Sequence, residues 1–184
     1  IMRLGNLAPR SSDGEFQINF HSNSFMGRLK AYQTLGAIPY SGLTAKTEFS
    51  PIDETARAIC LLAGTNSDCV IFNVFNPHRA LYLDLVDRMN RMGHGIMAVG
   101  GAEFERILQE ALQDPKNADI LQSMLAYTSR SDGKTAVFNS YASDYTTEVL
   151  YHLGFQWNPT TWDYMEQFLI QIQALEFFDD DYNR

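Results

Sequence analysis

The 184-residue chain contains only two cysteines, Cys60 and Cys69, and it has no Cys-x-x-Cys pair. So few thiols predict neither a disulfide framework nor a cysteine-based zinc site. Each cysteine lies in an apolar stretch, so we expect two buried, reduced thiols. The chain also lacks a run of 18 apolar residues and a stretch with the pattern of a signal peptide. We therefore expect no membrane span and a cytoplasmic location.

Basic charge is also scarce, because 14 Lys and Arg residues face 22 Asp and Glu residues and the formal net charge is -8. The basic residues are scattered, so we expect neither a nucleic acid nor an anionic membrane as a partner. The four histidines, His21, His78, His94 and His152, lack ligand spacing, and no calcium-loop pattern occurs. No Gly-x-Ser-x-Gly sequence is present either. We therefore expect no metal site and no serine hydrolase.

Short strands and amphipathic helices alternate over the first hundred residues. Apolar and β-branched runs predict strands, the first of them buried, at 1–5, 70–75 and 96–99. Helical periodicity with start and stop signals predicts helices at 24–35, 51–63 and 80–92. The second helix has the clearest start, with Ser50 as the cap, Pro51 at the first position and Asp53 in the first turn.

The last 84 residues are predominantly helical. Periodicity and breakers predict helices over 102–112, 118–127, 144–153 and from about 160 to 178. By contrast, strand–helix–strand spacing over 47–99 fits the crossover units of a parallel sheet. So few short strands make only part of such a sheet, which needs helices on both faces. We therefore expect an α/β fold whose neighbouring strands lie upstream of residue 1.

Three local patterns could belong to a ligand-binding site, but for each of them a purely structural role is favoured. Gly-His-Gly-Ile-Met-Ala at 93–98 matches the relaxed dinucleotide pattern Gly-x-Gly-x-x-Ala. It follows a helix and leads into a strand, the reverse of what pyrophosphate binding needs, so we interpret it as a helix stop. His78, after a strand, is interpreted as a cap of the next helix. The aromatic side chains of Phe155, Trp157, Trp162 and Tyr164 are interpreted as core.

Several segments together resemble one family. Arg-Leu-Gly-Asn-Leu at 3–7 is similar to the strand and turn that follow the catalytic pair of extended short-chain dehydrogenases. The longer stretch Arg-Leu-Gly-Asn-Leu-Ala-Pro-Arg-Ser-Ser-Asp-Gly-Glu-Phe-Gln-Ile-Asn-Phe at 3–20 resembles the terminal thioester reductase domains of nonribosomal peptide synthetases. Further similarity lies in Phe-Ser-Pro-Ile-Asp-Glu-Thr-Ala-Arg-Ala-Ile at 49–59 and Phe-Asn-Val-Phe-Asn-Pro-His at 72–78. The closing segments 154–157 and 175–179 fit the family's C-terminal helices.

This resemblance implies a remnant of a Rossmann-type parallel sheet over 1–100, followed by a mostly helical substrate-binding subdomain over 101–184. The family delivers a hydride from NAD(P)H to a carrier-bound thioester and releases an aldehyde or, after a second reduction, an alcohol. By the resemblance, the nicotinamide side of the cleft is formed by Gly5, Asn6 and Leu7. The substrate side is formed by Phe16, Gln17, Asn19, Phe20 and His78.

The catalytic pair of the family, Tyr-x-x-x-Lys, is absent, because none of the nine tyrosines has a lysine four residues later. Without this pair, proton donation to the carbonyl oxygen has no donor. We therefore expect a C-terminal part that is inactive alone, with NADP(H) bound by the complete domain and no cofactor bound here. The expected partners are a phosphopantetheinylated peptidyl carrier domain and an N-terminal Rossmann half. We also expect self-association through an exposed sheet edge.

Two alternatives stay open from the residues alone. One is a non-catalytic module that binds a carrier protein or ligand, because such a module would keep the same residues. The other is part of a nucleotide-sugar epimerase or dehydratase of the extended short-chain family. The block Asp-Gly-Glu-Phe-Gln-Ile-Asn-Phe at 13–20 speaks against this second alternative.

Overall fold

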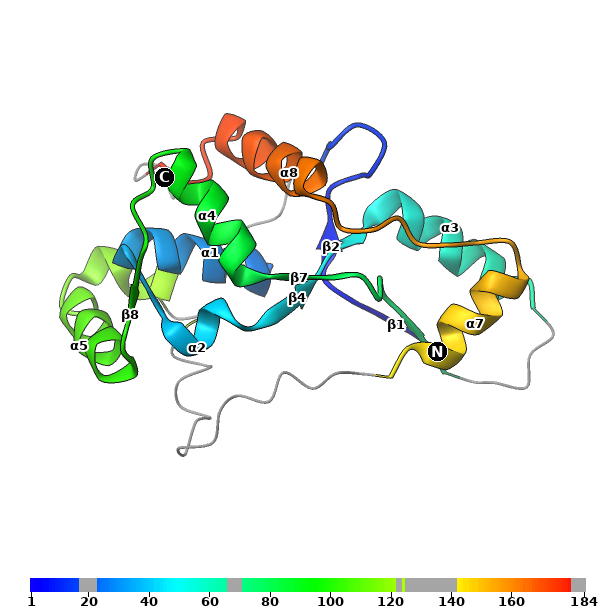
Figure 1. Cartoon of the computed structure of the whole chain (residues 1–184), viewed down its shortest axis with the longest axis horizontal. Helices are drawn as coiled ribbons and strands as arrows, with labels where there is room; N and C mark the ends of the chain where they lie inside the picture. The colour runs from blue at the N-terminus through cyan, green and yellow to red at the C-terminus, as the bar shows by residue number, and fades with distance from the viewer. Residues whose placement is uncertain (17–22, 66–70, 122–123, 125–141, 180–184) are drawn as a thin grey trace. The chain divides into compact units, whose positions relative to one another are not determined.

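The computed structural model describes residues 1–16, 23–65, 71–121, 124 and 142–179, and these residues form alternating short strands and helices (Figure 1). The strands are β1 Met2–Leu4, β2 Leu7–Ala8, β3 Ala37–Pro39, β4 Lys46–Glu48, β5 Ser50–Pro51, β6 Phe72–Val74, β7 Arg79–Leu81 and β8 Met97–Val99. The helices are α1 Ser24–Leu35, α2 Tyr40–Leu43, α3 Ile52–Ala63, α4 Tyr82–Arg91, α5 Gly101–Ala111, the 3-10 helix η2 Pro115–Asn117, α7 Asp144–His152 and α8 Trp162–Ala174.

The strands form parallel pairs, which confirms the predicted α/β class with few short strands and a helical C-terminal region. β1 pairs with β6, β2 with β5 and β3 with β8, all in parallel, and β4 pairs with β7. The three strands predicted from the sequence correspond to β1, β6 and β8. The sequence did not predict β3, which contains Pro39, or β7, because Ala80 and Leu81 were included in the predicted helix at 80–92.

Each of the two compact units of the chain collects three separate segments. The first unit contains Ile1–Gln17, Lys46–Ala80 and Asn139–Gln171, and the second contains Ile18–Ala45, Leu81–Phe138 and Ile172–Arg184. The predicted division at residue 100 into a Rossmann-like and a substrate-binding part stays a prediction.

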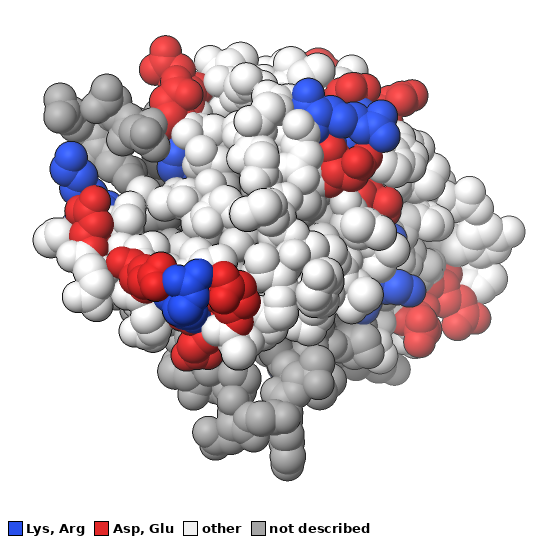
Figure 2. All heavy atoms as spheres, turned by 60° about the vertical axis from the view of Figure 1, so that its left-hand side comes forward, with Lys and Arg blue, Asp and Glu red and all other residues white. Residues whose placement is uncertain are grey.

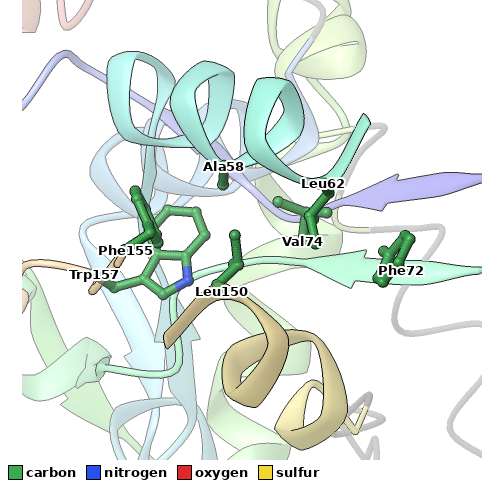
Figure 3. Close-up of a cluster of buried hydrophobic side chains, with 7 residues drawn as sticks. All are labelled: Ala58, Leu62, Phe72, Val74, Leu150, Phe155 and Trp157. Atoms are coloured by element: carbon green, nitrogen blue, oxygen red, sulfur yellow. The ribbon is translucent and has the colours of Figure 1, made fainter. Parts of the chain in front are cut away.

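The core of the first unit lies between α3, β6 and α7. Figure 3 shows apolar side chains from these elements pointing toward one another. The buried cluster consists of Ala58, Leu62, Phe72, Val74, Leu150, Phe155 and Trp157. The rings of Phe155 and Trp157 meet edge to face with centroids 5.2 Å apart, a favourable aromatic geometry. Burial of this cluster stabilises the first unit.

The two sides of β6 are occupied differently. On one side, the Phe72 amide donates to the Ile1 carbonyl at 2.8 Å, and the Val74 carbonyl accepts from Gly5 at 3.3 Å. On the other side, the Asn73 amide donates to the Thr146 hydroxyl oxygen of α7 at 3.0 Å. Alternate residues of a strand direct their backbone groups to opposite sides, so β6 lies between β1 and α7.

In the second unit, α1, α4 and α5 share an apolar core. Leu29 of α1 and Leu85 of α4 are fully buried, and the Tyr32 ring lies 6.2 Å from both Tyr82 and Phe104. The helix predicted at 24–35 is confirmed as α1, and it ends at Gly36, which adopts a left-handed φ of 58°. Glycine fits this position because it has no Cβ.

Four local expectations were wrong. Cys60 is exposed, and Cys69 lies outside the described residues. β1 is not buried, because Leu4 is 44% exposed. α3 begins at Ile52, with Pro51 in an extended conformation as its N-cap, and Ser50 makes no cap hydrogen bond. Trp162 is 43% exposed rather than part of the core.

Basic side chains on the face shown in Figure 2 mostly lie beside acidic ones. Arg106 pairs with both Glu103 and Glu110, and Arg91 pairs with Asp87 at 2.9 Å. Among the residues described, no helix combines the length and hydropathy needed to cross a membrane. The same residues contain no group of three or more His, Cys, Asp or Glu side chains suited to a metal ion.

Candidate functional site

The candidate site lies in the first unit, where β1 and β6 end side by side. The two strands are parallel, with Leu4 opposite Val74, so the turns that follow them lie at the same edge. Residues 5–7 continue from β1, and residues 75–78 continue from β6. In open parallel sheets, ligands bind beyond the carboxyl ends of the strands.

Glu48 fixes the turn after β1. Its carboxylate accepts hydrogen bonds from the backbone amide of Asn6 and, at 2.6 Å, from the hydroxyl of Ser50. The Asn6 carbonyl in turn accepts from the Ser50 amide at 3.0 Å. The turn is therefore held both by a carboxylate and by the parallel pairing of β2 with β5.

Gly5 makes room for this carboxylate. A Cβ atom at position 5 would lie far inside van der Waals contact with Oε1 of Glu48. Glycine is needed here for close approach, so any larger residue would displace the carboxylate from the Asn6 amide.

Ser50 extends the same hydrogen-bonded chain to the turn after β6. Its hydroxyl oxygen accepts from the Asn76 amide at 3.0 Å, and both residues are fully buried. The Asn76 side chain accepts from the His78 amide at 2.9 Å and donates to the Asn158 carbonyl at 3.0 Å. A continuous path thus runs from Asn6 through Glu48, Ser50 and Asn76 to His78.

Opposing effects act on the pKa of Glu48. Burial raises the pKa of its carboxyl group, while the hydrogen bonds from Ser50 and Asn6 and the positive charge of Arg79 lower it in part. The net pKa is raised. A carboxylate with these two donors is suited to holding backbone in place, because both of its bonds end on groups of the protein.

A second carboxylate anchors the loop that leads to Phe16. Asp53 of α3 accepts from the Ser11 amide at 3.0 Å, from the Ser11 hydroxyl at 3.1 Å and from the Ser12 amide at 3.2 Å. Burial raises the pKa of Asp53, but the hydrogen bonds from Ser11, Glu54 and Ser12 together outweigh it, so the net pKa is lowered. The Tyr164 hydroxyl donates to the Pro9 carbonyl at 2.8 Å and holds the start of the same loop.

The structure places the predicted site residues in two groups. Gly5, Asn6, Leu7 and His78 lie at the shared carboxyl-terminal edge of β1 and β6. Phe16 instead packs on Phe168, with ring centroids 6.2 Å apart. Gln17, Asn19 and Phe20 lie outside the described residues. The assignment of these residues to cofactor and substrate stays a prediction.

His78 does not cap the next helix, contrary to expectation. α4 begins at Tyr82 with Leu81 as its N-cap, and β7 intervenes. The His78 side chain is exposed, while its carbonyl accepts from the Thr160 hydroxyl at 2.7 Å. By contrast, the interpretation of residues 93–98 as a helix stop is confirmed, since Gly93 and Gly95 have φ values of 100° and 66° between α4 and β8.

Sequence reasoning missed the polar residues that link the turns. The sequence predicts no functional role for Glu48, and it predicts Ser50 as a helix cap. A carboxylate beside the apolar Phe49 in a strand is one available signal, because buried charges require partners. Glu48 and Ser50 are only two residues apart, but their other partners, Asn6 and Asn76, come from segments too distant in sequence for local patterns to show.

The sequence matches no protein-family model and no curated protein sequence. Solved structures do match. A thiolation-reductase di-domain from an archaeal nonribosomal peptide synthetase is 27% identical, with a TM-score of 0.81 over 97% of this chain. This chain resembles a thioester reductase domain. The same likeness at the level of fold extends to the reductase domain of the aureusimine biosynthetic cluster, with 24% identity and a TM-score of 0.72 over 96% of this chain.

The match to reductase domains is partial in length. The chain spans 36% of the archaeal di-domain and 44% of the aureusimine reductase chain. The terminal reductase domain of the myxalamid pathway adds a fold match at 16% identity, with a TM-score of 0.78 over 97% of this chain and 45% of that one. The helices and parallel strand pairs described above thus resemble a segment of these reductase domains.

Proposed function

We propose that this chain forms the C-terminal part of an NAD(P)H-dependent thioester reductase that releases a carrier-bound peptidyl thioester as an aldehyde or an alcohol. The supporting observation is the 27% identity over 97% of the chain to a domain pair that joins thiolation and reductase domains. That pair also supports a phosphopantetheinylated carrier domain as the partner.

The residues at the carboxyl-terminal edge of β1 and β6 suit the nicotinamide ring of the cofactor, whereas the described part of this chain has no site suited to its pyrophosphate. Asn6 and Leu7 are partly exposed beyond the carboxyl end of β1, where an α/β sheet binds ligands. Residues 93–98 do not fit the pyrophosphate, because they do not open a helix. In the proposal, an N-terminal Rossmann half binds the pyrophosphate, and residues 5–7 border the nicotinamide.

The bound cofactor would supply a hydride to the carbonyl carbon of the thioester, and loss of the pantetheine thiolate would give the aldehyde. This chain's own residues would bind and orient. Glu48 fixes the backbone at Asn6 beside the nicotinamide, and Asp53 fixes the loop before Phe16 on the substrate side. Proton donation to the carbonyl oxygen needs a residue outside this sequence, because no Tyr-x-x-x-Lys pair occurs in it.

The test compares this chain with a version extended upstream. Binding and oxidation of NADPH are measured for both, with an acyl-pantetheine thioester as the substrate. Turnover by the extended version alone supports the proposal. Binding of NADPH by this chain alone would contradict the placement of the pyrophosphate in an N-terminal half. Residues 93–98 would then be the candidate pyrophosphate site. Carrier binding by the extended version without NADPH oxidation would favour the non-catalytic binding module.

A further inference from the structure

The path from Asn6 to His78 joins the two turns that the proposed function assigns to different ligands. Residues 5–7 belong to the predicted cofactor side, and His78 belongs to the predicted substrate side. Each step between them is a hydrogen bond to a side chain: Asn6 to Glu48, Ser50 to Glu48, Asn76 to Ser50, and His78 to Asn76. The turns therefore share an interior link in addition to the pairing of their strands.

The middle of this path is sealed from solvent. Ser50 is 0% exposed and Asn76 is 1% exposed, so water cannot replace a lost partner without a rearrangement. The Ser50 hydroxyl donates to Glu48 and accepts from Asn76, so its single hydrogen and one lone pair are both used. Loss of either partner leaves a buried polar group unsatisfied, and this makes the links interdependent.

We infer that Glu48 and Ser50 are positioning residues that couple the turn at residues 5–7 to the turn at residues 76–78. Displacement of one turn, by a ligand or by a substitution, moves the other through these two side chains. The inference rests on the proposed function for what each turn binds. The coupling itself rests on the hydrogen bonds and burial alone.

Ser50→Ala is the decisive variant, because the Ser50 side chain touches neither the Asn6 amide nor the His78 amide. Amide hydrogen exchange is measured by NMR on the full chain, without any ligand. We expect exchange at both Asn6 and His78 to rise about tenfold, because the variant removes one buried hydrogen bond on each side of Ser50. A rise at Asn76 alone would show separate local contacts and would overturn the coupling.

Glu48 provides a conservative rescue. Glu48→Ala removes both links and should raise exchange at Asn6 and His78 as Ser50→Ala does. Glu48→Gln keeps an acceptor for the Asn6 amide and gains a donor for the Ser50 hydroxyl oxygen, although the Ser50 hydrogen loses its acceptor. Exchange at His78 should therefore rise clearly less than in Glu48→Ala. If Gln raises His78 exchange as much as Ala does, the hydrogen-bonded path is not the cause and the inference is wrong.

Asp53→Asn is the matched control, because Asp53 anchors a different loop of the same unit. It should raise exchange at Ser11 and Ser12 and leave Asn6 and His78 unchanged. Exchange of the Leu150 amide in α7 reports general opening of the unit. If Ser50→Ala raises exchange at Leu150 as much as at Asn6 and His78, the comparison of Glu48→Gln with Glu48→Ala decides instead. In the extended version, Ser50→Ala should raise the KM values for NADPH and for the thioester together, whereas Asp53→Asn should leave the NADPH KM unchanged.

The two kinds of readout separate this inference from the proposed function. Exchange needs neither cofactor nor thioester, so it decides the coupling even if no reductase activity is found. Coupled exchange without NADPH oxidation would reject the reductase and keep the link between the turns. NADPH oxidation with exchange changes confined to Asn76 would support the reductase and reject the link between the turns.

Discussion

The carboxylate of Glu54 accepts two hydrogen bonds from Asn158, one from its backbone amide at 3.0 Å and one from its side-chain amide at 2.7 Å. The two residues are separated by 104 positions in the sequence. Glu54 is 8% exposed, so the pair ties the segment after α7 to the first turn of α3 in a buried setting. The carbonyl of the same Asn158 accepts from Asn76, which connects this contact with the candidate site.

Glu54→Gln should destabilise the first unit. Glutamine offers one acceptor oxygen, and its amide group would face one of the two Asn158 donors. We expect the free energy of unfolding to fall by about 1–3 kcal/mol, the typical cost of an unsatisfied buried group. Urea denaturation followed by circular dichroism measures this change. Glu103→Gln, which removes one side of an exposed ion pair, is the control and should have little effect, and equal effects would contradict the prediction.

Gly5→Ala should destabilise the chain through Glu48. The new Cβ would push the carboxylate away from the Asn6 amide, leaving that amide and the Ser50 hydroxyl poorly satisfied. The expected loss in unfolding free energy is about 1–3 kcal/mol. Gly101→Ala is the matched control, because no atom lies within 4 Å of its added Cβ and alanine favours the helix there. A loss no larger than that of Gly101→Ala would show that Glu48 adjusts without cost.

Asp53 should make stability depend on acid pH. Its lowered pKa means that folding favours the charged form, so its contribution is present above the unfolded-state value of about 3.9. The contribution is lost as the pH falls through the folded-state pKa. The difference in unfolding free energy between the original chain and Asp53→Asn should therefore be constant near neutral pH and shrink below about pH 4. A difference that does not change down to about pH 2.5 would refute this sign.

Leu150 and Leu153 provide a matched pair around the end of α7. Leu150 is 1% exposed in the core cluster, whereas Leu153 is 38% exposed. Leu150→Ala should cost about 2–5 kcal/mol of unfolding free energy, the range for a cavity in a packed core. Leu153→Ala should cost about 0.5 kcal/mol or less. Similar losses for both would mean that the cluster in Figure 3 is not the stabilising core of the first unit.

The exposed edge of β1 should promote self-association. Among the described residues β1 pairs only with β6, and Leu4 is 44% exposed. Charged residues on an edge oppose strand pairing, so Leu4→Lys should lower the mass measured by light scattering at high concentration. Leu83→Lys, at a similarly exposed leucine of α4, should leave the mass unchanged. A monomer at all concentrations in the original chain would contradict this expectation.

Elements with strong local signals could be predicted from the sequence. The Asn23 side chain caps α1 and Gly36 ends it, and the apolar run before Asn76 forms β6. The site could be predicted less well, because Glu48, Ser50 and Asn158 acquire their roles through partners far along the chain. Ser50 illustrates the difference: its position before Pro51 indicates a helix cap, but the buried donors and acceptors around it use its hydroxyl instead. Tertiary contacts thus decided what local propensity left ambiguous.

The hydrogen bond to the Thr146 hydroxyl determines at which edge of the β1–β6 pair a further strand can be added. Because it occupies the outward amide of Asn73, α7 closes that side of β6 to a further strand at this point. On β1, alternation directs the backbone groups of Met2 and Leu4 away from β6. A further strand would therefore pair with β1 rather than with β6. β1 would then become an interior strand of the sheet, and β6, covered by α7, would remain its edge strand.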